Sequence, residues 1–372
     1  MSTQTTPGTE PAADSGSTTA TAAGGGTESL PAKALRILLT QRIALLVLLL
    51  ATVLITMSQL SANNYLSAPY STSYLAATLI NAVPLVMLGL AELLVITSGR
   101  GGIDLSVGAI VSLTGMVFGF AYGEWGWSLP AALVLAVVFG GLCGAVNGAL
   151  IAYLGFPALI TTLATYYGFS SLALVVNDQR PINSQPVQDL YSTASAVSLP
   201  FLPDSFPRIP LGVFTFLIPT AVVVWLVLAR TTYGRRLYAI GTNDVAAEWT
   251  GINVARTRFT AYVAAGAISG LVAVVTVAQF ASARPDSGVA GNGMALPAIT
   301  IAVLGGVAIT GGIGRVAGVV LAALLIVWLN AGILLAVPGN AGSQFQLFAL
   351  GVVLVFAALL NGFSNRRYGG TS

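Results

Sequence analysis

Residues 73–97 read SYLAATLINAVPLVMLGLAELLVIT, an apolar run long enough to cross the hydrocarbon core of a bilayer as an α-helix. Its one charged residue is Glu92. The whole chain has the same character: 56% of its 372 residues are hydrophobic, 7% are charged, and the mean hydropathy is +0.87. A soluble domain carries about 25% charged residues. The composition therefore excludes a soluble globular protein and predicts a membrane protein.

Similar runs recur along the chain and predict ten spans in total. Lipid-exposed backbone must satisfy its own hydrogen bonds, so we expect helices and an all-α polytopic membrane protein. Glycine and proline interrupt the third, eighth and tenth runs, which we expect to be broken or tilted. The predicted spans are 43–60, 73–97, 103–122, 129–154, 157–176, 211–229, 259–280, 294–310, 316–337 and 345–362.

The regions outside the spans divide the chain into a body and two tails. Residues 1–30 are rich in Ser, Thr, Gly, Ala and Pro and predict a disordered N-terminal tail. The transmembrane domain covers 31–365, and 366–372 form a C-terminal tail. Its longest loops are 177–210 on the predicted outer face and 230–258 on the predicted inner face.

Basic residues predict the orientation. With ten spans and the N-terminus inside, only Arg180, Arg208 and Arg284 lie outside. The other twelve basic residues lie on the cytoplasmic side, as the positive-inside rule requires, and both termini are then cytoplasmic. These are Lys33, Arg36, Arg42, Arg100, Arg230, Arg235, Arg236, Arg256, Arg258, Arg315, Arg366 and Arg367.

Missing residue types exclude several chemistries. The chain has no histidine and one cysteine, Cys143, within an apolar run, so we expect no metal site, no cofactor and no catalytic residue. Its only lysine, Lys33, lacks the Gly-Lys-Ser/Thr context of a P-loop. The pI of about 9.1 goes with a net charge of only +3 and no basic stripe, so nucleic acid is not an expected partner. Any ATP hydrolysis belongs to another subunit.

The inner loop contains a predicted short helix. Asn243 is a suitable N-cap, Asp244 suits the positive end of the helix dipole, and Gly251 suits the position after the C-cap. Two interpretations stay open from the residue types alone. The helix lies in the membrane interface with Trp249 among the headgroups, or it docks a soluble cytoplasmic subunit.

A polar, glycine-rich segment, TSGRGGIDLSVG at 97–108, separates the second and third runs. Asp104 can cap the following helix by accepting backbone N–H bonds near Ser106. A break of this kind can also line a water-filled path, and the two roles are compatible.

Polar residues within the spans are costly in lipid. We expect Asn81, Pro84, Glu92 and Asn147 to face the bundle interior or a cavity, and Glu92 also lies close enough to the cytoplasmic end to extend toward the interface. Gly140, Gly144 and Gly148 share one helix face, which predicts close helix packing.

Three motifs carry a resemblance to a known family. They are GIDLSVG at 102–108, GRRLYAIG at 234–241 continuing to GINV at 251–254, and LGG at 304–306 with GGIG at 311–314 through Gly318. With Asn147-Gly148 and Arg180-Pro181-Ile182, they spread over about residues 40–362. The chain resembles the membrane permease subunit of ribose-type ABC importers, which have the vitamin B12-importer-like (type II) fold.

The resemblance implies a half-channel that pairs with a second permease copy or a paralogue. It also implies two cytoplasmic ABC ATPase subunits, an extracytoplasmic sugar-binding protein and a location in the inner or plasma membrane. The implied ATPase-coupling residues are Asn243, Asp244, Ala247, Glu248 and Gly251. The residues expected at the translocation path or its helix break are Asn81, Gly102, Asp104, Ser106, Gly108 and Asn147. Arg180, Arg208 and Arg284 are the expected contacts for the binding protein.

The scarcity of charge at membrane depth favours a neutral polar substrate. Ribose, another aldopentose, a deoxyhexose and the furanosyl signal autoinducer-2 all fit. A self-sufficient facilitator or secondary carrier is the alternative function, and a non-transporting scaffold is a third.

Overall fold

The computed structural model describes residues 41–194, 196–197, 207–290 and 293–368. The predicted disordered tail at 1–30 lies outside this range, as do residues 369–372 of the C-terminal tail. The elements are α2 (Arg42–Ala62), α3 (Thr72–Thr97), α4 (Val107–Phe118), the π-helical η1 (Gly119–Glu124), α5 (Leu129–Ala152), α6 (Ala158–Val175), α7 (Gln185–Ala194), β1 (Ala196–Val197), β2 (Ile209–Pro210), the π-helical η2 (Val213–Leu217), α8 (Ile218–Arg230), α9 (Thr232–Thr242), α10 (Asp244–Trp249), α11 (Val254–Phe280), α12 (Ala295–Leu304), α13 (Val316–Ala336) and α14 (Asn340–Tyr368).

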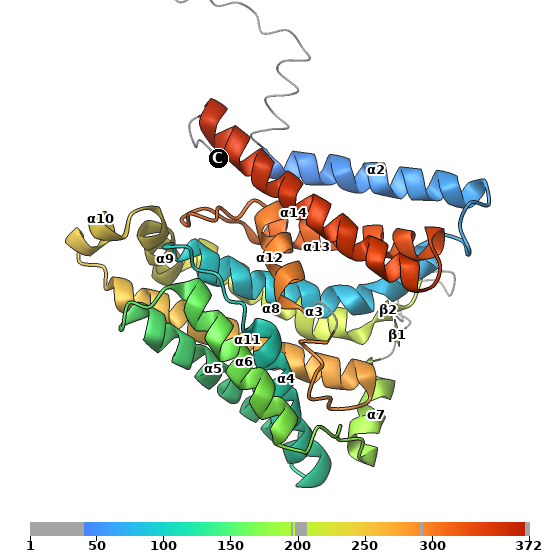
Figure 1. Cartoon of the computed structure of the whole chain (residues 1–372), viewed down its shortest axis with the longest axis horizontal. Helices are drawn as coiled ribbons and strands as arrows, with labels where there is room; N and C mark the ends of the chain where they lie inside the picture. Colours follow the sequence, from blue (N-terminus) through green and yellow to red (C-terminus); the bar gives the residue numbers. More distant parts are fainter. Residues whose placement is uncertain (1–40, 195, 198–206, 291–292, 369–372) are drawn as a thin grey trace, which may run out of the picture.

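Long apolar helices dominate the described part of the chain. Nine of them, counting α4 with η1 and η2 with α8 as single helices, are long and apolar enough to cross a membrane. They coincide with nine predicted spans, with ends that differ by a few residues, and confirm an all-α polytopic membrane protein. Figure 1 shows the bundle with α10 at one end and α7 at the opposite end. We call these the α10 end and the α7 end.

The predicted span at 294–310 is the exception, because only the ten residues of α12 are helical there. Ala283 forms a β-bridge with Ile182 near the α7 end, and the backbone of Gly288 then lies against Gly108 at the start of α4. After α12, the Gly312 N–H donates to the Thr97 carbonyl at the α10 end, 3.1 Å away. The eighth crossing is therefore an irregular segment followed by a short helix.

Helix α3 forms the centre of the core. Its side chains are buried almost without interruption from Ala82 to Thr97, and α11, α12 and α13 pack around it. Helix α5 packs on α11 through small residues. A Cβ atom on Gly140 or Gly144 would collide with the backbone of Gly266 or Tyr262. The predicted glycine packing face is thereby confirmed, and it brings Asn147 of α5 against the interior.

Candidate functional site

The irregular segment between α3 and α4, residues 98–106, lies at a buried polar cluster. Asp104, Ser106 and Asn147 are fully buried. Asp104 Oδ1 accepts hydrogen bonds from the Ser106 N–H (2.9 Å) and Ser106 Oγ (2.6 Å), so the predicted bond to the backbone near Ser106 is present. It lies just ahead of α4, because Ser106 is itself the N-cap and makes no side-chain cap bond. Asn147 Nδ2 donates to Ser106 Oγ (2.7 Å) and more weakly to Asp104 Oδ1 (3.5 Å). Thr165 of α6 donates to Asn147 Oδ1 at 2.7 Å.

The structure places the two polar residues of α3 differently. Glu92 faces the bundle interior, as expected, and does not reach an interface: it is fully buried, and its Oε2 accepts the Asp104 N–H at 3.4 Å. Asn81 is exposed on the surface of the single chain, so of its two expected settings the interior of this chain is excluded and a cavity stays a prediction. The fold around α3 encloses Glu92 in the core, whereas the first turns of α3 lie partly outside it.

A second feature is a backbone junction of glycines at the α10 end. Gly99 belongs to the α3–α4 segment, Gly241 to the last turn of α9, and Gly311 and Gly312 to the segment between α12 and α13. A Cβ on Gly241 would collide with the backbone of Thr97 and of Gly312, and one on Gly311 would collide with Gly99. Three segments that are distant in sequence therefore meet main chain to main chain. We call this contact the glycine junction.

Tyr238 connects α9 to the segment that follows the glycine junction through a hydrogen bond. Its hydroxyl donates to the Gly314 carbonyl at 2.7 Å. Burial raises the pKa of Tyr238 above its ordinary value, although the nearby Arg315 guanidinium opposes the shift. The hydroxyl is therefore neutral and remains a donor at physiological pH.

Helix α10 has the predicted ends. The Asn243 side chain accepts the Ala246 N–H at 3.0 Å, and Gly251 has a φ of +84°, where its N–H donates to the Glu248 carbonyl. The preceding helix, α9, was not predicted. It is amphipathic and buries Leu237 and Ile240 against the bundle.

Ion pairs hold the start of α10 against the body. Asp244 Oδ2 lies 2.5 Å from Arg100 Nε and 3.5 Å from Arg258 Nη2. Arg258 is nearly buried, and its Nη2 also donates to the Ser98 carbonyl at 3.2 Å. Asp244 thus links α10 to the same irregular segment that contains Asp104.

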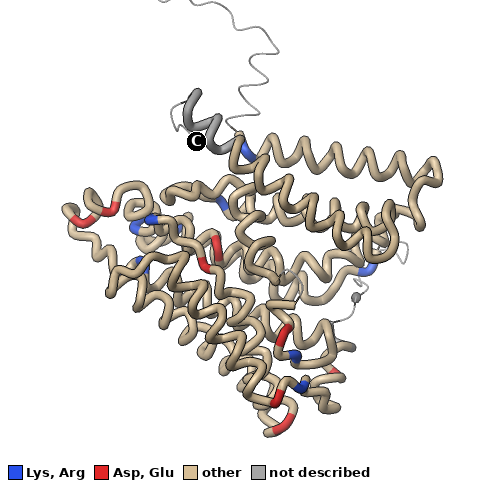
Figure 2. Tube along the Cα trace, viewed as in Figure 1, with Lys and Arg blue, Asp and Glu red and all other residues tan. Residues whose placement is uncertain are grey.

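The outward side of α10 is apolar at its centre. The Trp249 side chain is 88% exposed, Val245 is 58% exposed, and Glu248 is exposed beside them. Ala247 faces the opposite way and is buried. Figure 2 shows charged residues gathered around this end of the bundle and around the opposite end. Helix α10 therefore exposes the Trp249 side chain among charged residues.

The three basic residues predicted to bind an outer partner lie at the α7 end but differ in setting. Arg180 and Arg284 flank the bridge between Ile182 and Ala283, whereas Arg208 precedes β2. Arg284 Nε lies 3.3 Å from Asp286 Oδ1, and its guanidinium stacks on Phe280. Arg180 and Arg208 are exposed, so they are the more available pair.

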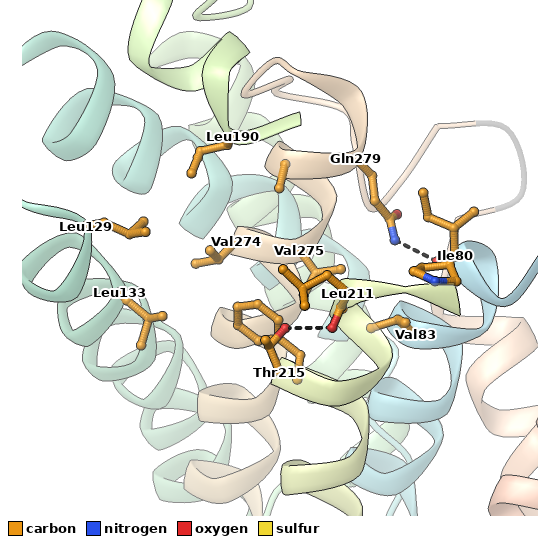
Figure 3. A pocket seen from close by; sticks show the side chains of 14 residues that line it. Ile80, Val83, Leu129, Leu133, Leu190, Leu211, Thr215, Val274, Val275 and Gln279 are labelled. Atoms are coloured by element: carbon orange, nitrogen blue, oxygen red, sulfur yellow. Dashed lines mark hydrogen bonds between the residues drawn. The ribbon is translucent and has the colours of Figure 1, made fainter. Parts of the chain in front are cut away.

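Two hollows were not predicted from the sequence. A cavity of about 280 Å³ near the α7 end is lined by apolar side chains of α3, α5, η2 and α11. Figure 3 shows that the Gln279 amide donates a hydrogen bond to the Ile80 carbonyl and the Thr215 hydroxyl donates one to the Leu211 carbonyl. A more open groove runs along α6, past Thr161, Ala164, Thr165 and Gly168. Of the two, only the groove along α6 is in contact with the polar cluster, through Thr165.

Comparison with known proteins identifies the family. The model of the family described as "branched-chain amino acid transport system / permease component" matches residues 74–358. The chain belongs to this permease family. The match contains the polar cluster, the glycine junction and α10, and it leaves out α2.

Curated relatives of the permease cover most of its length. It is 35% identical over 287 residues to the autoinducer 2 import system permease protein LsrD of Salmonella typhimurium, covering 77% of this chain and 81% of the relative. It is 34% identical over 306 residues to LsrD of Photorhabdus temperata (80% and 84% covered). It is 34% identical over 290 residues to the probable ABC transporter permease protein y4mJ of Sinorhizobium fredii (77% and 80% covered). No solved structure matches the chain.

These matches confirm the predicted kinship with permease subunits of sugar-type ABC importers. The permease is a multi-pass membrane protein and a transport subunit, and ATPase and substrate-binding partners come with such a family. The vitamin B12-importer-like fold stays a prediction.

Proposed function

We propose that the permease is the transmembrane subunit of an ATP-driven importer that moves a neutral, sugar-like solute into the cytoplasm. The single observation that carries the coupling part is the construction of α10. Its outer side exposes Trp249, while its base is tied by Asp244 to Arg100 and Arg258. An exposed tryptophan on a helix that ion pairs hold in place is suited to binding in a pocket on a soluble protein. We assign that protein as the ATPase, contacted by Asn243, Asp244, Glu248 and Gly251; Ala247, the fifth residue expected there, is buried and packs α10 against the bundle instead.

The substrate proposal rests on charge. The family description mentions branched-chain amino acids, whereas two of the relatives import autoinducer 2. A zwitterionic amino acid would require fixed counter-charges along its path. In the described part of the permease, Glu92 and Asp104 are fully buried, and the groove of α6 is lined by apolar residues with two threonines, Thr161 and Thr165, and no charged residue. The lack of a fixed charge in this lining favours an uncharged solute, and the two hydroxyls suit one that hydrogen-bonds, such as a monosaccharide or the furanosyl autoinducer.

The path itself is proposed to follow α6. Its groove exposes Ala164 and Gly168, and Thr165 connects it to Asn147. A second permease copy or a paralogue would close the open side. Of the residues expected at the path, only Asn81 is exposed in the single chain. The other residues of that set are buried behind the residues that line the groove: Gly102, Asp104, Ser106, Gly108 and Asn147.

In the assembly that we propose, the two ends of the bundle bind different partners. Two ATPases would bind two permeases at the α10 end, and an extracytoplasmic sugar-binding protein would bind at the α7 end near Arg180, Arg208 and Arg284. This arrangement requires a plasma or inner membrane with both termini in the cytoplasm. Neutralising the three arginines together should weaken binding of that protein and reduce the salt dependence of binding.

The test is uptake of labelled ribose, with unlabelled monosaccharides and autoinducer 2 as competitors. Membrane vesicles would contain the permease, its candidate ATPase and binding protein, with or without internal ATP. We expect ATP-dependent uptake in the wild type, and loss of uptake and of ATPase co-purification in Glu248→Arg. The matched control is Glu124→Arg, an exposed charge reversal near the α7 end. Equal flux without ATP or partners would establish a facilitator instead.

A further inference from the structure

Three fully buried oxygen atoms meet beside the α3–α4 segment without partners. They are Glu92 Oε1, Asp104 Oδ2 and the Tyr262 hydroxyl, each from a different segment. Within the described part of the chain, none of the three has a hydrogen-bond partner. Both carboxyls act electrostatically on Tyr262, and Asp104 acts on Glu92, so the three groups are neighbours. Buried polar atoms rarely remain unpaired in proteins, so a missing proton or ligand is indicated.

The charges around this point do not balance. The carboxyls of Glu92 and Asp104 and the guanidinium of Arg258 all lie near Tyr262. Arg258 is paired with Asp244, which also contacts Arg100. Three carboxylates and two guanidiniums leave one uncompensated negative charge. The helices packed nearby supply no counter-charge in the core: α4, α5, α12 and α13 contain no Asp, Glu, Lys or Arg, and the remaining arginines of α9 and α11 (Arg235, Arg236 and Arg256) are exposed. An unpaired buried charge is expensive, and such groups commonly neutralise.

The hydrogen bonds show which carboxyl keeps its charge. Thr165 donates to Asn147, Asn147 donates to Ser106, and Ser106 donates to Asp104 Oδ1. The Ser106 N–H and Asn147 Nδ2 donate to the same atom. Several donors converging on one oxygen stabilise a carboxylate. Glu92, by contrast, accepts only the long bond from the Asp104 N–H among the described residues.

We propose that Glu92, Asp104 and Tyr262 form a buried proton-binding site, in which Glu92 carries the proton and Asp104 is ionised. The proton sits on Glu92 Oε1 and turns that unpaired acceptor into an O–H donor. The remaining four charged side chains, Asp104, Asp244, Arg100 and Arg258, then sum to zero. Tyr262 brings a second O–H to the site.

Infrared spectroscopy of the full-length permease in lipid nanodiscs at neutral pH tests the proposal. A protonated carboxyl has a carbonyl stretch distinct from that of a carboxylate, and deuterium shifts it. We expect this band in the wild type, its loss in Glu92→Gln, and its retention in the matched control Glu124→Gln, which removes an exposed carboxylate. Because glutamine is neutral and nearly isosteric, Glu92→Gln should keep the wild-type melting temperature.

The wild type alone can overturn the proposal, even if the variant does not fold. Absence of the carboxylic band at neutral pH would show that both acids are ionised. A sodium ion is the competing source of the missing charge. A melting temperature that rises when sodium replaces choline, in the wild type and not in Glu92→Gln, would also overturn the proton assignment. Neither measurement depends on transport, so the proton-binding proposal can fail without the proposed function failing, and the reverse also holds.

Discussion

The orientation of one amide, that of Asn147, determines the polarity of the buried cluster. Thr165 donates to its oxygen, which leaves its nitrogen to donate toward Ser106 and Asp104. A leucine at this position would fill the space but supply no donor, and an aspartate would add a further charge. The amide therefore joins the groove on α6 to the carboxylate at the helix break.

Replacing Asn147 with alanine should destabilise the permease. The change removes the amide that donates to Ser106 and Asp104, and each buried group left unpaired costs about 1–3 kcal/mol; the Thr165 hydroxyl keeps the Thr161 and Thr162 carbonyls as acceptors. The measurement is the unfolding midpoint in detergent. The matched control is Asn81→Ala, which removes an exposed amide from α3 and should leave the midpoint near that of the wild type. Equal losses in the two variants would contradict the role assigned to Asn147.

At the scale of elements, local chemistry was predictable and contacts between distant segments were not. The ends of α10 follow from Asn243 and Gly251, and the bond from the Ser106 N–H to Asp104 ahead of α4 follows from Asp104, because each interaction spans only a few residues. The burial of Glu92 beside Asp104 depends on α11, α12 and α13 packing around α3. No periodicity in 73–97 encodes it.

The eighth crossing shows the same division. Its glycine and proline content predicted an interruption, but the position of the break is set by contacts between distant segments. Gly288 lies against Gly108, and the Gly288 N–H donates to Ser112 Oγ at 2.9 Å. The broken crossing therefore packs against the start of α4.

The glycine junction should be intolerant of any side chain. In Gly241→Ala the new Cβ would press on main-chain atoms of Thr97 and Gly312, which cannot rotate away. We expect a loss of about 1–3 kcal/mol, as for overpacked cores, together with weaker ATP-dependent uptake. Gly351→Ala on α14 is the control, because a Cβ there meets open space and alanine favours a helix. Thermal unfolding and uptake would be measured for both. A wild-type midpoint in Gly241→Ala would mean that the three segments are not held together.

At the scale of the whole molecule, charged residues gather at the two ends of the bundle (Figure 2). The α10 end carries Arg100, Arg235, Arg236 and Arg256, all of them exposed. The α7 end has a mixed set that includes Asp178, Arg180 and Asp189. By the positive-inside rule, this asymmetry predicts that the α10 end lies in the cytoplasm, where we propose that the ATPase reaches Trp249.

Cysteine labelling can test this orientation, because the one native thiol, Cys143, is buried. In a Cys143→Ala background, we expect Arg180→Cys to react with a membrane-impermeant maleimide in intact spheroplasts. Trp249→Cys, at a side chain that is 88% exposed, should react only after the membrane is permeabilised. Adding the ATPase subunit to permeabilised membranes should then slow labelling at Trp249→Cys and not at Arg180→Cys, because docking covers α10. Labelling of Trp249→Cys in intact spheroplasts would invert the topology and remove the ATPase-docking role of α10. Reaction of both positions only after permeabilisation would place the α7 end inside as well, which contradicts the single crossing, η2 with α8, that lies between Arg180 and Trp249.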